Sequence, residues 1–179
     1  MSFLKNRPLP SKASVISVYS IIAFMVYSWT LMTFFYTLPS WMKYLTTKEI
    51  LIIFAYAMSV DLLESILVLA GILVLYYLLP KSLLKEDFRI HGTWLAISGL
   101  GLLMLYFLPS PDIKQWIGNP WWWVVLTLIV TVLITIFFSR LPFTRKFALF
   151  FQDRMPAFLA IFIPISIVSL LVIVVYLLF

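Results

Sequence analysis

Cysteine is absent from this chain of 179 residues, and histidine occurs once, at His91. The absence of cysteine excludes disulfides, thiolate metal sites, covalent c-type haem attachment and a cysteine nucleophile. A single histidine excludes a pair of imidazole ligands within one chain. We therefore expect neither a metal site nor a bound cofactor.

Charged residues are also scarce, at 11% of the chain against 64% hydrophobic residues. A soluble domain usually carries about 25% charged residues. The apolar residues lie in runs long enough to cross a bilayer. This composition predicts a polytopic integral membrane protein whose partner is the lipid bilayer. We attribute the net charge of +6 to the orientation of the chain in the membrane, which lysine and arginine determine. We do not interpret it as a sign of nucleic-acid binding.

Five apolar runs are separated by proline and polar clusters. Backbone groups in hydrocarbon must pair within their own segment, so each run is expected to be a helix. The predicted fold class is all-α, a single transmembrane domain of five helices over residues 1–179. The third run is short and contains Gly99 and Gly101, so four spans plus a re-entrant segment is the alternative. The expected spans are about 13–38, 50–79, 92–108, 120–139 and 156–179.

Signals at the starts of these runs support the expected helices. Thr46 and Glu49 have the spacing of a capping box. Asn119 precedes Pro120 as a cap precedes a proline at the first helical position, and Pro156 plays the same part for the last run. The first run follows basic residues, as in a signal peptide, but exceeds the roughly 7–15 apolar residues of a cleavable segment. We expect it to be retained.

Lysine and arginine are distributed unevenly between the two sides of the membrane. Ten lie in the N-terminal segment, the loop after the second span and the segment after the fourth, and three lie in the other loops. The positive-inside rule then predicts a cell-membrane protein with a cytoplasmic N-terminus and an outer C-terminus. Five tryptophans would form a belt at the outer interface: Trp41, Trp116, Trp121, Trp122 and Trp123.

The stretch MSVDLLESILVL, residues 58–69, places Asp61 and Glu64 inside the second span. An acidic residue at the centre of a span costs roughly 2.5–3.5 kcal/mol. The spacing of three puts both carboxyls on one helix face. We expect residues 48–58 to follow the outer interface, which leaves the pair in the outer third of the membrane. With no cation among the apolar residues, at least one carboxyl should be protonated, or a bound cation or water must serve.

Hydroxyl side chains on other spans can donate to these carboxyls. We predict a polar interior formed by the first, second and fourth spans. The pair has three interpretations: a packing contact with an outer lysine, a cation or proton site, or a contact with a partner subunit. The candidate residues are Asp61, Glu64, Ser65, Tyr27, Thr30, Thr127 and Thr131.

Two segments on the cytoplasmic side carry clustered charge. Residues 81–94, which include His91, are interpreted as a solvated loop with orienting charges. Residues 143–155 combine aromatic and basic side chains, as does a helix lying in the membrane plane on anionic lipid; a docking surface for a partner is the alternative. Its membrane-interface residues are Arg145, Lys146, Phe147, Phe150, Phe151 and Arg154.

Catalytic motifs are missing from the sequence. There is no HExxH, GxSxG, phosphate-binding GKS/T loop or glycine-rich dinucleotide turn. The predicted function is therefore a non-catalytic subunit or scaffold of a membrane assembly, in contact with a membrane protein partner or with further copies of itself. The alternative is a small oligomeric transporter or channel that uses Asp61 and Glu64 as a cation or proton site.

Overall fold

The computed structural model describes residues 10–78, 88–107 and 120–178. Within these ranges the chain forms six helices and no strand. The helices are α1 (Lys12–Trp41), α2 (Thr47–Leu78), α3 (Phe88–Phe107), α5 (Pro120–Arg140), α6 (Pro142–Arg154) and α7 (Pro156–Leu178).

Five of the helices in the described ranges are long and apolar enough to cross a membrane; α6 is the exception. The expected all-α, five-span fold is therefore confirmed. The third span is a full helix with a stretch from Phe88 to Leu105 that is long and apolar enough to cross a membrane, which favours five spans over the re-entrant alternative. The chain is a multi-pass membrane protein.

Local signals at the helix starts explain where the helices begin. Ser11 caps α1, because its hydroxyl accepts a hydrogen bond from the Ser14 amide at 3.2 Å. The capping box before α2 is confirmed. The Thr46 amide donates to Glu49 Oε2 at 2.7 Å, and the Glu49 amide donates to Thr46 Oγ1 at 3.4 Å.

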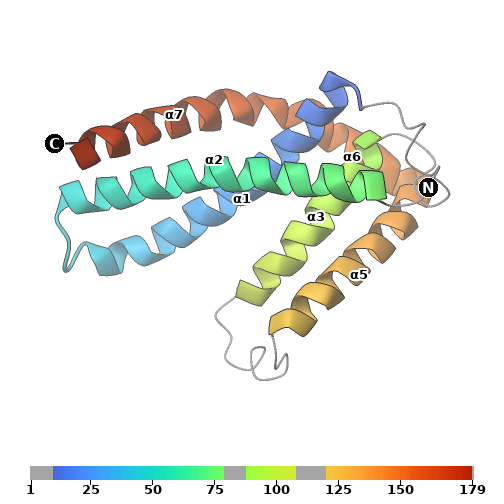
Figure 1. The fold of residues 1–179 in the computed structure, drawn as a ribbon, viewed down its shortest axis with the longest axis horizontal. Helices are drawn as coiled ribbons and strands as arrows, with labels where there is room; N and C mark the ends of the chain where they lie inside the picture. The colour runs from blue at the N-terminus through green and yellow to red at the C-terminus, as the bar shows by residue number, and fades with distance from the viewer. Residues whose placement is uncertain (1–9, 79–87, 108–119, 179) are drawn as a thin grey trace.

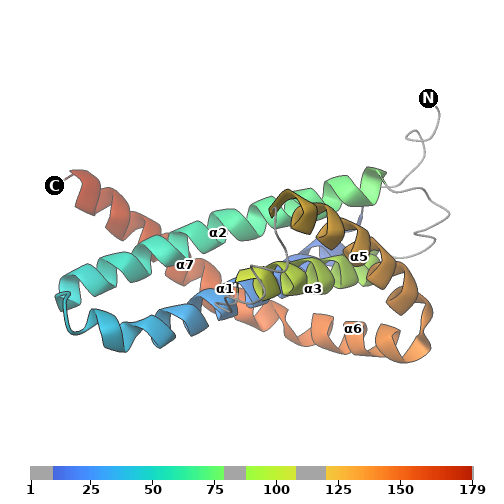
Figure 2. The ribbon, with the colours of Figure 1, turned by 90° about the horizontal axis from the view of Figure 1, so that it is seen from below.

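Three helices form one layer of the molecule and two form a diverging pair. Figures 1 and 2 show α1, α2 and α7 lying along the long axis, and Figure 1 shows α3 and α5 leaving this layer at an angle. The helix α1 is central, because it contacts α2, α3, α6 and α7, whereas α5 packs against α3 and α6.

The main apolar core lies where α3 crosses α1. Its buried members include Val18, Ile22, Leu95 and Ala96, and Met155 closes it from the connection between α6 and α7. The two backbones approach closely at Gly92, where an added Cβ would lie 2.9 Å from Val18 Cγ2. Glycine at this position therefore allows the crossing.

The last three helices are joined by very short connections. Leu141 alone separates α5 from α6, and Met155 alone separates α6 from α7. Pro142 and Pro156 occupy the first positions of α6 and α7, where the missing amide hydrogen costs nothing. The expected helix at about 143–155 is present as α6.

The apolar helix α7 lies beside the first half of α2, and Lys48 Nζ is 6.0 Å from the Tyr176 ring centre. Since α7 carries no charged side chain, this contact argues that α2 shares the hydrocarbon from about Lys48 onward. A rise of 1.5 Å per residue then puts Asp61 about 20 Å and Glu64 about 24 Å below Lys48.

Candidate functional site: an intramembrane polar cluster

Asp61 is enclosed between α2 and α1, with 3% of its surface exposed. The Thr30 hydroxyl donates to Asp61 Oδ1 at 2.7 Å. The second carboxyl oxygen, Oδ2, is buried and has no hydrogen-bond partner among the described residues. The site thus holds a carboxyl group with one oxygen bonded and the other open to a proton, a cation or a water.

Two further hydrogen bonds join α1 to its neighbours in the layer. The buried Tyr27 hydroxyl lies 2.5 Å from Ser166 Oγ on α7, and the Tyr27 ring stacks on Phe162 with 4.6 Å between centroids. The Tyr19 hydroxyl lies 3.3 Å from Ser65 Oγ on α2. We call the residues of these three interhelical pairs the intramembrane polar cluster; it comprises Tyr19, Tyr27, Thr30, Asp61, Ser65 and Ser166.

The structure brings four of the predicted site residues into this cluster: Tyr27, Thr30, Asp61 and Ser65. The expected third wall of the polar interior needs correction, because α7 supplies it in place of α5. A row of hydroxyls along a helix indicates a face that contacts another helix, but it does not show which helix. In a membrane the hydrophobic effect does not select the partner either, because lipid tails are as apolar as the side chains of a neighbouring helix.

Thr127 and Thr131 lie on the side of α5 that faces α3. Both are buried, and neither hydroxyl has a hydrogen-bond partner among the described residues. Thr131 Cγ2 would lie 3.6 Å from a Cβ added to Gly99. With Gly71 of α2 they line an apolar groove of about 200 Å³ between α2, α3 and α5. They therefore belong to helix packing and not to the surroundings of Asp61.

Glu64 also departs from the expectation that both acids share one environment. Its side chain is exposed, while that of Asp61 is buried. Three helical residues turn the chain by about 300°, so positions three apart differ in direction by about 60°. That difference is enough to put one carboxyl in the interior and the other on the outer face.

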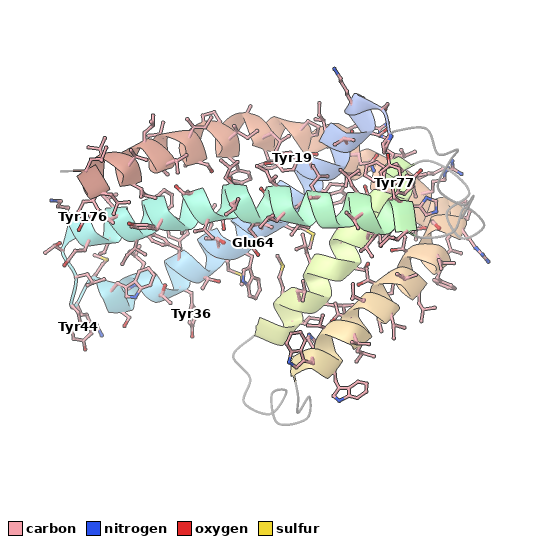
Figure 3. The ribbon with its side chains drawn as sticks, in the orientation of Figure 1. Tyr19, Tyr36, Tyr44, Glu64, Tyr77 and Tyr176 are labelled. Carbon is pink, nitrogen blue, oxygen red and sulfur yellow. The ribbon has the colours of Figure 1, made fainter. Side chains whose placement is uncertain are left out.

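The surroundings of Glu64 on that outer face are apolar. Val60, Leu63 and Leu67 are 55%, 60% and 61% exposed, respectively. Figure 3 places Glu64 near the middle of α2, far from Tyr44 and Tyr176 at one end of the layer. No hydrogen bond or ion pair joins Glu64 to another described residue.

Two members of the cluster, Ser166 and Tyr19, were not predicted from the sequence. Ser166 and the buried Ser169 are spaced by three in α7, whose other side chains are almost all apolar. Polar residues are rare in such a helix and commonly face a neighbouring helix. The spacing of these two serines could therefore have identified the face of α7 that contacts another helix. Tyr19 carried no comparable signal in a span with several other hydroxyls.

The helix α6 separates its residues into a packed face and an outer face. Thr144, Ala148 and Gln152 are buried, whereas Arg145, Lys146, Phe147, Phe150 and Arg154 are exposed. The Arg154 guanidinium lies 4.4 Å from the centre of the Phe150 ring. Phe151 differs from the expected outer placement, because it is partly buried against the main core. An exposed aromatic and basic face is typical of a helix at a membrane surface.

Polar contacts join α6 to the start of α3. The fully buried Gln152 donates from Nε2 to the Arg89 carbonyl at 2.7 Å and also to Thr93 Oγ1. Arg89 forms an ion pair with Asp153 at 2.9 Å. His91 is buried within α3, which corrects the interpretation of residues 88–94 as solvated loop. Residues 81–87, 112, 114, 116 and 119 lie outside the described ranges.

Within the ranges that the structure describes, no three His, Asp or Glu side chains gather as metal ligands would. No family model, curated protein or solved structure matches the chain. Any functional conclusion therefore rests on the residues themselves.

Proposed function

We propose that this protein is a non-catalytic subunit or scaffold of a membrane assembly, and that Glu64 lies at its contact with another membrane protein or with a further copy of this chain. The observation that carries the proposal is an exposed carboxyl group on an otherwise apolar face of α2. The apolar neighbours of Glu64 support a position in hydrocarbon, where an unpaired acid costs a few kcal/mol. A partner that supplies a cationic or hydrogen-bonding side chain would remove that cost.

The intramembrane polar cluster fits the same role. Three of its hydrogen bonds run between helices, two from α1 to α2 and one from α1 to α7. Polar contacts of this kind stabilise helix association in membranes by roughly 1 kcal/mol each. They fix the layer that presents Glu64.

The proposed setting is the cell membrane, with the N-terminus in the cytoplasm. Six of the eight described lysines and arginines lie at the helix ends on the side where α1 begins, namely Lys12, Arg89, Arg140, Arg145, Lys146 and Arg154. Lys43 and Lys48 lie at the other end. This distribution supports the orientation given by the positive-inside rule.

The test is the mass of the assembly isolated from native membranes in mild detergent. We expect the wild-type chain and the Glu64→Asp variant, which keeps the charge, to elute in particles larger than one chain with its detergent. Glu64→Lys should reduce the particle to a single chain, because it places like charges together at the contact. A monomeric wild-type protein, or a Glu64→Lys variant of unchanged mass, would contradict the proposal.

A second candidate function is cation or proton transfer at Asp61. The observation in its favour is the buried Oδ2 atom without a hydrogen-bond partner. A carboxyl group in that state gains from binding a proton or a cation. The neutral Asp61→Asn substitution distinguishes the two candidates, because it keeps an acceptor for Thr30 but removes the acidic proton.

A further inference from the structure

A continuous apolar groove follows the seam between α2 and α7. One hollow of about 840 Å³ lies at the outer end of the seam, and a second of about 470 Å³ lies further along it. The two share Leu51, Val168 and Val172, so they form one groove. On α7 the lining runs from Pro164 to Tyr176, about 18 Å of helix. We call this surface the α2/α7 groove.

The outer end of the groove carries one positive charge, the ammonium group of Lys48, 6.0 Å from the Tyr176 ring centre. The carboxylate of the neighbouring Glu49 is turned toward Thr46, whose amide and hydroxyl donate hydrogen bonds to it. No described carboxylate lies within ion-pair distance of Lys48. Its charge is therefore available to a ligand.

Below Lys48 the groove is lined almost entirely by apolar side chains, with Ser169 as the polar exception. Polar and apolar parts thus follow each other in the order found in a phospholipid, with the charged group at the membrane surface and the alkyl chain inside. A single cation at the end of a long apolar groove matches a molecule with one anionic group and a hydrocarbon tail. A lysine near an anionic lipid surface stabilises such contacts.

We infer that the α2/α7 groove binds one anionic phospholipid of the bilayer, with its phosphate on Lys48 and one acyl chain along Leu51, Val168 and Val172. A zwitterionic phospholipid binds more weakly, because its own cationic group competes with Lys48 for the phosphate. The inference does not depend on whether Glu64 contacts another chain.

The test is native mass spectrometry of the delipidated full chain titrated with phosphatidylglycerol and, separately, with phosphatidylcholine. The wild-type protein should retain one phosphatidylglycerol at a lower concentration than it needs for phosphatidylcholine. Lys48→Gln should weaken phosphatidylglycerol binding about fivefold, the effect of one lysine at an anionic surface. Val172→Trp should prevent retention of both lipids, because the indole fills the groove.

Two matched controls separate this site from general lipid contact. Lys43→Gln removes an exposed lysine at the same end of the molecule, outside the groove lining, and Leu170→Trp places the same indole on the opposite side of α7. Both should bind as the wild type does. Equal weakening in Lys48→Gln and Lys43→Gln, or normal binding by Val172→Trp, overturns the inference. A doubled protein mass in place of a bound lipid, lost in Val172→Trp, also overturns it by assigning the groove to a second copy.

Discussion

At the residue scale, Asp61 shows how this chain accommodates an acid inside the membrane. One carboxyl oxygen accepts a hydrogen bond from Thr30 on the neighbouring helix, and the other is enclosed with no partner among the described side chains. Asparagine at this position would keep an acceptor oxygen for Thr30 but would have no acidic proton to exchange. This substitution therefore separates a packing role from a chemical one.

We expect Asp61→Asn to unfold in detergent with a stability within about 0.5 kcal/mol of the wild type, because the acceptor for Thr30 is retained. Thr30→Val should lower the free energy of unfolding by about 1 kcal/mol, the contribution of an interhelical hydrogen bond in a membrane. Thr37→Val is the matched control, since the Thr37 hydroxyl bonds only to carbonyls of its own helix. Equal losses of unfolding free energy in Thr30→Val and Thr37→Val would contradict a stabilising hydrogen bond between Thr30 and Asp61.

The same Asp61→Asn protein distinguishes the two candidate functions when it is reconstituted in liposomes. A structural role for Asp61 predicts an assembly of unchanged mass and no cation or proton flux specific to the wild type. Flux through wild-type liposomes that disappears in Asp61→Asn, with the assembly intact, would favour the second candidate. Asp153→Asn serves as the control for a carboxyl that lies outside both the cluster and the proposed contact.

The residues of this cluster also show what a sequence can reveal about a site. Asp61 was identifiable because an acid in an apolar span is costly, and Thr30 because a hydroxyl on another span can donate to it. The separation of Asp61 from Glu64 was not identifiable. An angle of about 60° on the helix surface leads to different surroundings only once the positions of α1 and α7 are known.

At the element scale, α6 is held to α3 by two contacts of different kinds. Gln152 is fully buried and donates to Thr93 and to the Arg89 carbonyl, whereas the ion pair of Arg89 with Asp153 is largely exposed. Exposed ion pairs contribute about 0–1 kcal/mol. The buried side-chain amide of Gln152 should therefore contribute most of the free energy that holds α6 against α3.

We expect Gln152→Ala to lower the free energy of unfolding by about 2 kcal/mol, because it leaves buried polar groups unpaired and creates a cavity. Asp153→Asn should lower it by less than about 1 kcal/mol. Reversible unfolding in mixed micelles, followed by circular dichroism, measures both. A larger loss for Asp153→Asn than for Gln152→Ala would show that the exposed pair is the stronger contact.

The helices themselves were predictable because their signals are local. The capping box at Thr46 and Glu49 and the prolines at 120 and 156 mark helix starts within a few residues of sequence. Which helices pack together was not predictable. The stripe of Thr127, Thr131 and Thr135 suited a contact with Asp61 as well as it suited the contact with α3 that the structure contains.

At the scale of the whole molecule, we expect five crossings to place the start of α1 and the end of α7 on opposite sides of the membrane. The natural absence of cysteine allows single cysteines to report on this arrangement. We expect Lys43→Cys to react with a membrane-impermeant maleimide added outside intact cells. Ser11→Cys and Arg145→Cys should react only after the cells are permeabilised. Labelling of Ser11→Cys and Lys43→Cys from the same side would contradict an odd number of crossings between them.

The single-residue connections at Leu141 and Met155 have a mechanical consequence. Proline fixes one backbone dihedral at the start of each following helix, and one residue leaves little freedom at either joint. We therefore expect a reorientation of α5 within the bilayer to move α6 and the start of α7 as well. The helix α7 carries Ser166 and one wall of the α2/α7 groove. A tilt of α5 would therefore change the position of that wall relative to α2.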